Sequence, residues 1–194
     1  MPTAKGPLYK VAFRRRRENR TDYRKRLGQI RSDAPRLVVR ASNKGIRAQF
    51  VRFEQAGDMT QAQAGSWELE PLGWMPQANA PTAYLVGLMA GTRAKKAGLK
   101  SFHIDIGLST ASKGRILFAA GMGARDAGLQ TELGDELIDA KRVKGEHIAA
   151  YAKELKSSNP SKFGQHFARY AAKNIDVTAL PALFDKTKAR IASG

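Results

Sequence analysis

Two runs of alternating apolar and polar residues, separated by a short turn, constrain the fold more than any other feature of this sequence. Alternation of this kind is typical of strands with one buried face. The expected buried positions are Leu37, Val39, Ala41, Ile46, Ala48 and Phe50. Between the runs, Asn43-Lys44-Gly45 has the composition of a turn. We therefore predict a β-hairpin. The residues that share its polar face are Arg40, Ser42, Arg47 and Gln49.

The segment that follows predicts further strands and two helices. We expect a weaker strand over residues 59–64, a helix from the cap Asn79 to about residue 97, a buried strand over 101–106 and a helix over 115–127. This order is typical of an α/β layer with a mixed β-sheet, in which the strand after the first helix joins by a crossover.

Two glycines lie four residues apart inside the first of these helices. Gly87 and Gly91 lower helix propensity, so a packing reason for them is expected. We predict that they permit close packing of the helix against the sheet.

The last third of the chain predicts helices only. Apolar residues recur with a period of about 3.6 from Ile148, Asn159-Pro160 combines an N-cap with a first-turn proline, and a final amphipathic segment begins near Leu180. At the other end of the chain, the spacing of Tyr23, Leu27 and Ile30 predicts a short helix with Thr21 as its N-cap.

These patterns predict an α/β fold, a mixed sheet with packed helices, and divide the chain into three parts. The predicted parts are a basic N-terminal extension with a short helix (1–34), an α/β core (35–140) and a helical C-terminal extension (141–194).

The net charge of +17 is concentrated at the two ends of the chain. Residues 1–52 contain 16 Lys+Arg and 3 Asp+Glu, residues 53–140 contain 7 and 10, and residues 141–194 contain 11 and 4. Evenly spread charge would serve solubility, whereas concentrated charge indicates a binding surface. We therefore expect polyanions as partners.

Four consecutive arginines, 14–17, form the densest part of this charge. Like charges repel one another unless an anion offsets the repulsion, and arginine favours bidentate contacts with phosphate. The interleaved aromatics Tyr9, Phe13 and Tyr23 suit stacking on unpaired bases. A solubilising or nuclear-localisation-like tail is the alternative interpretation, and the aromatics count against it.

Sequence signatures of catalysis and of cofactor or metal binding are missing or degraded. The chain has no cysteine, which excludes disulfides and cysteine-ligated zinc and is consistent with a reducing cytosolic environment. Its three histidines are not at metal-ligand spacings. Residues 107–114 resemble a phosphate-binding loop only superficially. No apolar run approaches the roughly 18 residues that a membrane helix needs. We expect no metal, no cofactor and no membrane association.

One carboxylate, Asp105, lies at the end of a predicted buried strand, where active sites often form. We expect it to hydrogen-bond to neighbouring backbone or to Lys113 or Arg115.

Sequence blocks in a fixed order run from about residue 6 to residue 152. The first is Gly-Pro-Leu-Tyr-Lys-Val-Ala-Phe-Arg-Arg-Arg-Arg-Glu at 6–18. The others include Thr21-Asp22-Tyr23 and residues 35–40, 79–88, 105–107, 126–129 and 145–149. Together these blocks resemble the archaeal and eukaryotic branch of large-subunit ribosomal protein eighteen, the 5S rRNA-binding family. At 130–133 the sequence Gln-Thr-Glu-Leu departs from the turn usual in that family.

The resemblance implies a structural constituent of the large ribosomal subunit, in the cytoplasm, which binds 5S rRNA and anchors it to the large-subunit rRNA in the central protuberance. It implies neighbouring ribosomal proteins as further partners, large-subunit ribosomal protein five among them. The matching positions expected to contact RNA are Lys10, Arg14, Arg15, Arg16, Arg17, Tyr23, Arg24, Arg40, Asn43 and Gln49. The charge pattern adds Arg20, Lys44 and Arg47.

Two other classes of protein share part of this pattern. An RNA-processing enzyme would use the basic ends to capture substrate and Asp105 to hold a metal ion, and it would need a second carboxylate near Asp105 in a cleft. A chromatin-type DNA compactor shares the charge but does not need a folded, near-neutral middle with two tryptophans.

Overall fold

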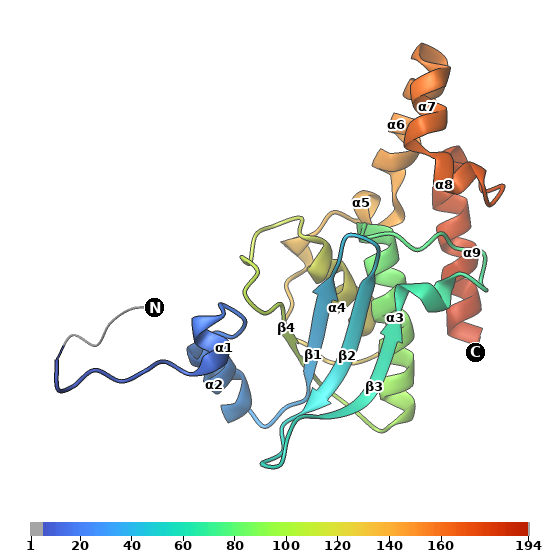
Figure 1. Ribbon diagram of the computed structural model, residues 1–194. Helices are drawn as coiled ribbons and strands as arrows, with labels where there is room; N and C mark the ends of the chain where they lie inside the picture. Colours follow the sequence, from blue (N-terminus) through green and yellow to red (C-terminus); the bar gives the residue numbers. More distant parts are fainter. Residues whose placement is uncertain (1–5, 194) are drawn as a thin grey trace.

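A four-stranded sheet lies at the centre of the protein in the computed structural model, which describes residues 6–193 without the side chain of Asp135 (Figure 1). The strand order is β3 (Met59–Gly65), β2 (Ile46–Arg52), β1 (Arg36–Ala41), β4 (His103–Asp105). The predicted hairpin is confirmed, since β1 and β2 are antiparallel with Arg40 opposite Arg47. Because β4 runs parallel to β1, the sheet is mixed, as predicted.

Two helices pack against each other on one face of the sheet. Helix α3 (Ala80–Lys96) begins at the predicted cap, where the Asn79 side chain accepts a hydrogen bond from the Thr82 N–H at 3.0 Å. Helix α4 (Ile116–Asp126) follows β4. The prediction that Gly87 and Gly91 face the sheet is wrong. They face α4, and a Cβ at Gly87 would overlap the Ala120 carbonyl. The two helix backbones are therefore in direct contact.

The C-terminal part is helical, as predicted. It contains α5 (Ala140–Lys144), α6 (Glu146–Ser158), α7 (Pro160–His166), α8 (Ala168–Ala171) and α9 (Leu180–Ser193). Single 3-10 turns are η1 (Ser66–Leu69), η2 (Asp135–Leu137) and η3 (Val177–Ala179). Helix α9 lies alongside α3, whereas α6 and α7 project beyond the sheet (Figure 1). Leu180, Phe184 and Ile191 of α9 are buried in the same apolar core as the sheet.

The N-terminal part lies at the β4 side of the sheet and extends away from it (Figure 1). It contains α1 (Arg14–Arg17) and α2 (Tyr23–Arg31). The predicted helix is present, but its cap is Asp22 and not Thr21. The Asp22 carboxylate accepts from the N–H groups of Arg24 and Lys25 at 3.0 and 3.3 Å. A charged acceptor at a helix N-terminus is favoured by the helix dipole as well as by hydrogen bonding.

The division of the chain into three parts, with boundaries at 34/35 and 140/141, remains a prediction. Among the helices of residues 6–193, none combines the length and the apolar character that crossing a bilayer requires.

Candidate nucleic-acid interface

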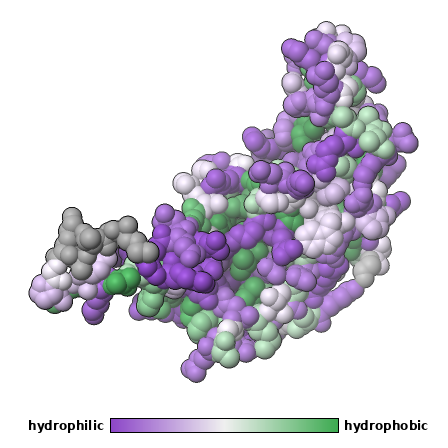
Figure 2. All heavy atoms as spheres, viewed as in Figure 1, coloured by the Kyte–Doolittle hydropathy of each residue, from purple (hydrophilic) through white to green (hydrophobic). Residues whose placement is uncertain are grey.

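The predicted RNA-contacting residues form two groups on the folded chain. The arm group, on α1, α2 and the segments beside them, is Lys10, Arg14, Arg15, Arg16, Arg17, Arg20, Tyr23 and Arg24. The hairpin group, at the β1–β2 turn, is Arg40, Asn43, Lys44, Arg47 and Gln49. All are exposed except Tyr23 and Gln49, which are half-buried. Hydrophilic residues gather where the arm meets the sheet (Figure 2).

The arginines of the arm differ in whether the protein supplies them with a partner. Arg14 and Arg20 lie on either side of Glu18, at 3.9 and 3.2 Å. The Arg15 Nε donates a hydrogen bond to the Thr21 hydroxyl at 2.8 Å. Within residues 6–193, by contrast, the side chains of Lys10, Arg16, Arg17 and Arg24 have no hydrogen-bond or ion-pair partner. Clustered cations without counter-charges favour the binding of an anion.

The aromatics of the arm contact each other. The rings of Phe13 and Tyr23 lie 5.2 Å apart between centroids, and this contact holds the start of α1 against α2. Next to Tyr23, a hollow of about 490 Å³ is lined by Arg16, Arg24 and Leu108. Stacking of Tyr9, Phe13 or Tyr23 on bases stays a prediction.

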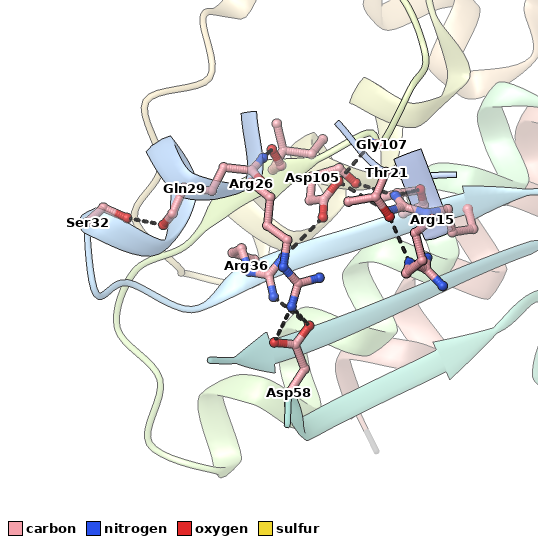
Figure 3. Close-up of polar contacts among 12 residues, drawn as sticks. Arg15, Thr21, Arg26, Gln29, Ser32, Arg36, Asp58, Asp105 and Gly107 are labelled. Atoms are coloured by element: carbon pink, nitrogen blue, oxygen red, sulfur yellow. Dashed lines mark hydrogen bonds and ion pairs between the residues drawn. The ribbon is translucent and has the colours of Figure 1, made fainter. Parts of the chain in front are cut away.

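A chain of charge pairs joins the arm to the sheet (Figure 3). Arg26 of α2 donates to both oxygens of Asp58 at 3.0 Å. Arg36, whose side chain is only 3% exposed, donates to Asp58 at 2.8 Å and to Asp105 at 3.3 Å. Arg40 continues the chain, donating to the Asp105 carboxylate at 3.2 Å and to its carbonyl oxygen at 2.7 Å. The two carboxylates thus fix three arginines at the base of the arm.

The expectation for Asp105 is half right. Its carboxylate does accept from a neighbouring backbone group, the Gly107 N–H at 2.7 Å. The predicted hydrogen bonds to Lys113 or Arg115 are wrong. Lys113 pairs with Glu136 at 3.3 Å, and Arg115 donates to the Thr110 carbonyl at 2.8 Å.

The sheet register explains the partners that Asp105 has. Val38 of β1 lies opposite Asp105 of β4, so Arg36 and Arg40, two residues before and after Val38, project on the same side and flank the carboxylate. Both Asp105 oxygens therefore accept from arginine. Across the described part of the chain, no three His, Cys, Asp or Glu side chains are placed to hold a metal ion.

A second hollow, the hairpin hollow, lies at the turn end of β1 and β2 and measures about 490 Å³. Its lining includes Arg40, Ser42, Lys44, Arg47, Gln49 and Trp67. The sequence-based site missed Trp67, whose ring lies under the Arg47 guanidinium at 5.0 Å. The available signal was its position three residues after the predicted third strand, which places it beside the hairpin if that strand pairs with β2.

Arg40 connects the two groups. It lines the hairpin hollow and also a smaller hollow of about 160 Å³ between the arm and the sheet, with Arg15, Arg20 and Asp105. The arm and the hairpin therefore form one cationic face, on which the Asp105 carboxylate is already paired with Arg36 and Arg40.

Comparisons with known proteins identify the family of the chain. The model of the family described as "Ribosomal large subunit proteins 60S L5, and 50S L18" matches residues 8–103. Large ribosomal subunit protein uL18 of Metallosphaera sedula is 44% identical over 192 residues, covering 98% of both chains. The uL18 of Halobacterium salinarum is 47% identical over 190 residues, covering 97% of this chain and 98% of the relative. Similarity of this level over nearly the whole length shows that the chain belongs to the uL18 family of large ribosomal subunit proteins.

Proposed function

We propose that the chain is a structural constituent of the large ribosomal subunit that binds 5S rRNA and anchors it to the large-subunit rRNA in the central protuberance. The observation that carries the proposal is the group of arm cations, Arg16, Arg17 and Arg24, which have no side-chain partner within residues 6–193. They belong to the same arm as Arg15 and Arg20, which line a hollow together with Arg40 of the hairpin. Phosphates of a folded RNA would supply the missing counter-charges.

The proposed division of labour follows from how each part is built. The sheet and the charge pairs of Asp58 and Asp105 hold the base of the arm, while the exposed arginines of α1 reach the RNA. Neighbouring large-subunit proteins, with large-subunit ribosomal protein five among them, are the proposed protein partners, on the ground of family membership.

No catalytic step is part of this proposal. An enzyme working through Asp105 would need that carboxylate free for a metal ion, and here Arg36 and Arg40 both donate to it. We propose a scaffold in which Asp105 positions arginines.

The test is filter binding of 5S rRNA by the full chain across a series of salt concentrations. We expect Arg16→Gln combined with Arg17→Gln to weaken binding. The negative slope of log K against log salt should become shallower by roughly 0.7 to 0.9 for each phosphate that the variant no longer neutralises. The matched control is Lys162→Gln combined with Lys186→Gln, which removes two exposed C-terminal cations and should leave the slope unchanged.

An unchanged slope in the arginine double variant would contradict phosphate contact by α1. A duplex DNA of equal charge, added as competitor, separates a compactor from an RNA-specific protein. We expect 5S rRNA to compete far more strongly than the duplex.

A further inference from the structure

One of the two tryptophans is exposed on the cationic face. Trp67 is 52% exposed, whereas Trp74 is 1% exposed and donates its indole N–H to the Thr82 hydroxyl at 2.9 Å. A large exposed apolar side chain is informative when it lies among functional groups, because its burial would otherwise stabilise the fold. Trp67 lies in the hairpin hollow, beside Arg47.

The backbone on both sides of Trp67 is fixed. The buried Ser66 hydroxyl accepts from the Ile46 N–H of β2 at 3.1 Å. On the other side, Glu68 accepts from the Gly65 N–H at 2.7 Å and pairs with Arg93 of α3 at 2.6 Å. The backbone that carries the exposed ring is therefore held in place before any ligand arrives, which reduces the entropic cost of binding.

Two glycines make room for this arrangement. A Cβ on Gly65 would overlap the six-membered ring of Trp67, so the indole lies directly over the backbone at the end of β3. A Cβ on Gly45, in the hairpin turn, would overlap the Ser66 hydroxyl. The absence of a side chain at these two glycines thus allows the hairpin turn, Ser66 and the indole of Trp67 to pack closely.

The surroundings of the ring favour an anionic ligand. Arg40, Lys44 and Arg47 line the hollow. Over the part of the chain that the structure describes, the Lys44 side chain has no hydrogen-bond or ion-pair partner. A volume of about 490 Å³ lies within the range of small-ligand sites. An aromatic platform with cations at its rim is the arrangement that recognises a base together with its phosphate.

We propose that the hairpin hollow binds one unpaired nucleotide of ribosomal RNA, with its base against the exposed part of the Trp67 ring and its phosphate beside Lys44 and Arg47. The inference rests on the proposed function, because it assigns part of the RNA contact to a site outside the arm. A paired base is excluded, since its faces are covered by neighbouring bases in the helix. An apolar protein segment would leave Lys44 and Arg47, which have no carboxylate partner within residues 6–193, without a counter-charge.

Tryptophan fluorescence of the full chain tests the proposal directly. The probes are 5S rRNA, large-subunit rRNA and a fully paired RNA duplex. We expect one of the two rRNAs to quench the emission of Trp67 and the duplex to leave it unchanged. In Trp67→Phe only the buried Trp74 emits, so the quenching should disappear.

Variants separate stacking from phosphate contact. Trp67→Ala should weaken binding of the quenching rRNA roughly ten-fold, the reduction expected for one stacked base, without changing the salt slope. Lys44→Gln should make that negative slope shallower by roughly 0.7 to 0.9. Gly65→Ala keeps the indole but displaces it and should reduce quenching. Phe53→Ala, at the far end of β2 and 43% exposed, is the matched control and should bind as wild type does.

The outcomes that overturn the inference are distinct from those that overturn the proposed function. If neither rRNA quenches the emission, or if folded Trp67→Ala binds with wild-type affinity, the nucleotide site is overturned. Salt-dependent filter binding of 5S rRNA would still support the proposed function in that case. Quenching by large-subunit rRNA alone supports the site, and failure of 5S rRNA to bind in the filter assay then overturns the 5S assignment only. Quenching by an acidic peptide and not by RNA would overturn the inference in favour of a protein partner.

Discussion

The N-terminal arm and the C-terminal helices are both basic extensions of one sheet, but different forces join them to it. Helices α1 and α2 bury no residue and are held by charge pairs such as Arg26 with Asp58. Helix α9 buries Leu180, Phe184, Thr187 and Ile191. Positive charge alone therefore does not identify the binding surface. What distinguishes the arm is that it gains little apolar burial from the body.

Three cations also help to attach the C-terminal part to the body. In the C-terminal part, Arg190 donates to the Leu72 carbonyl at 2.9 Å, Lys188 lies 5.1 Å from the centre of the Tyr84 ring, and Lys173 pairs with Glu70. These contacts fasten α9 and its neighbours to the body. In the arm, Arg16 and Arg17 make no such side-chain contact within residues 6–193.

The largest expected effect is on stability, from a substitution in the C-terminal helix α9. Phe184 is buried against the rings of Trp74 and Tyr84, so Phe184→Ala should lower the free energy of unfolding by about 3 to 5 kcal/mol. Phe13→Ala, at a ring that is 70% exposed, should lower it by less than about 1 kcal/mol. Urea denaturation of both variants measures the difference. Equal losses would show that the arm is part of the cooperative core.

A smaller effect is expected at the junction between arm and sheet. Asp105→Asn removes the charge that faces Arg36 and Arg40 while Asp58 still pairs with Arg36, so we expect a loss of about 2 kcal/mol in urea denaturation. Glu136→Gln, which breaks an exposed pair with Lys113, is the control and should change stability by less than about 0.5 kcal/mol. A loss no larger than the control's would mean that the buried pairs do not stabilise the junction.

Local opening of the arm should respond to a single ion pair. Arg26→Gln removes the bidentate contact with Asp58, worth about 1 kcal/mol for a partly exposed pair. Cleavage by chymotrypsin at Tyr23 should then accelerate roughly five-fold, since cleavage follows the population of the open state. Global unfolding by urea should barely change. Acceleration of cleavage in α9 as well would contradict independent attachment of the arm.

The smallest effect concerns a cap before α9. The Thr178 hydroxyl and N–H donate to Asp176 at 2.8 and 2.9 Å and lower the pKa of its carboxyl below the usual 3.8. A lowered folded-state pKa gives stability that is present above the unfolded value and is lost as the pH falls through the folded value. Asp176→Asn should therefore be slightly less stable than wild type at pH 7, and thermal melts should converge as the pH falls below 3.8 and through the lower folded-state value. A difference that persists there would exclude the charge as its cause.

The sequence predicted the elements whose signals are local. The hairpin at 43–45, the cap Asn79 and the start of α7 at Asn159-Pro160 depend on neighbouring residues, and all three were correct. The choice of Thr21 as a cap failed by one residue, because two adjacent side chains were both able to accept the hydrogen bond.

Features that depend on tertiary pairing were not predictable in the same way. Arg36 and Asp105 are 69 residues apart, and only the parallel pairing of β1 with β4 brings them together. The glycines of α3 face α4 because that helix returns beside it after β4. Trp67 lies on the cationic face because β3 pairs with β2, and this pairing is a tertiary contact.

Amide hydrogen exchange of the full chain, with and without 5S rRNA, tests the central claim most directly. We predict that 5S rRNA slows exchange in residues 14–31 and in the hairpin turn at 42–47, and leaves α9 unchanged because its amides are already protected by the core. Slowed exchange confined to the helices after residue 141, with the arm unaffected, would contradict the account.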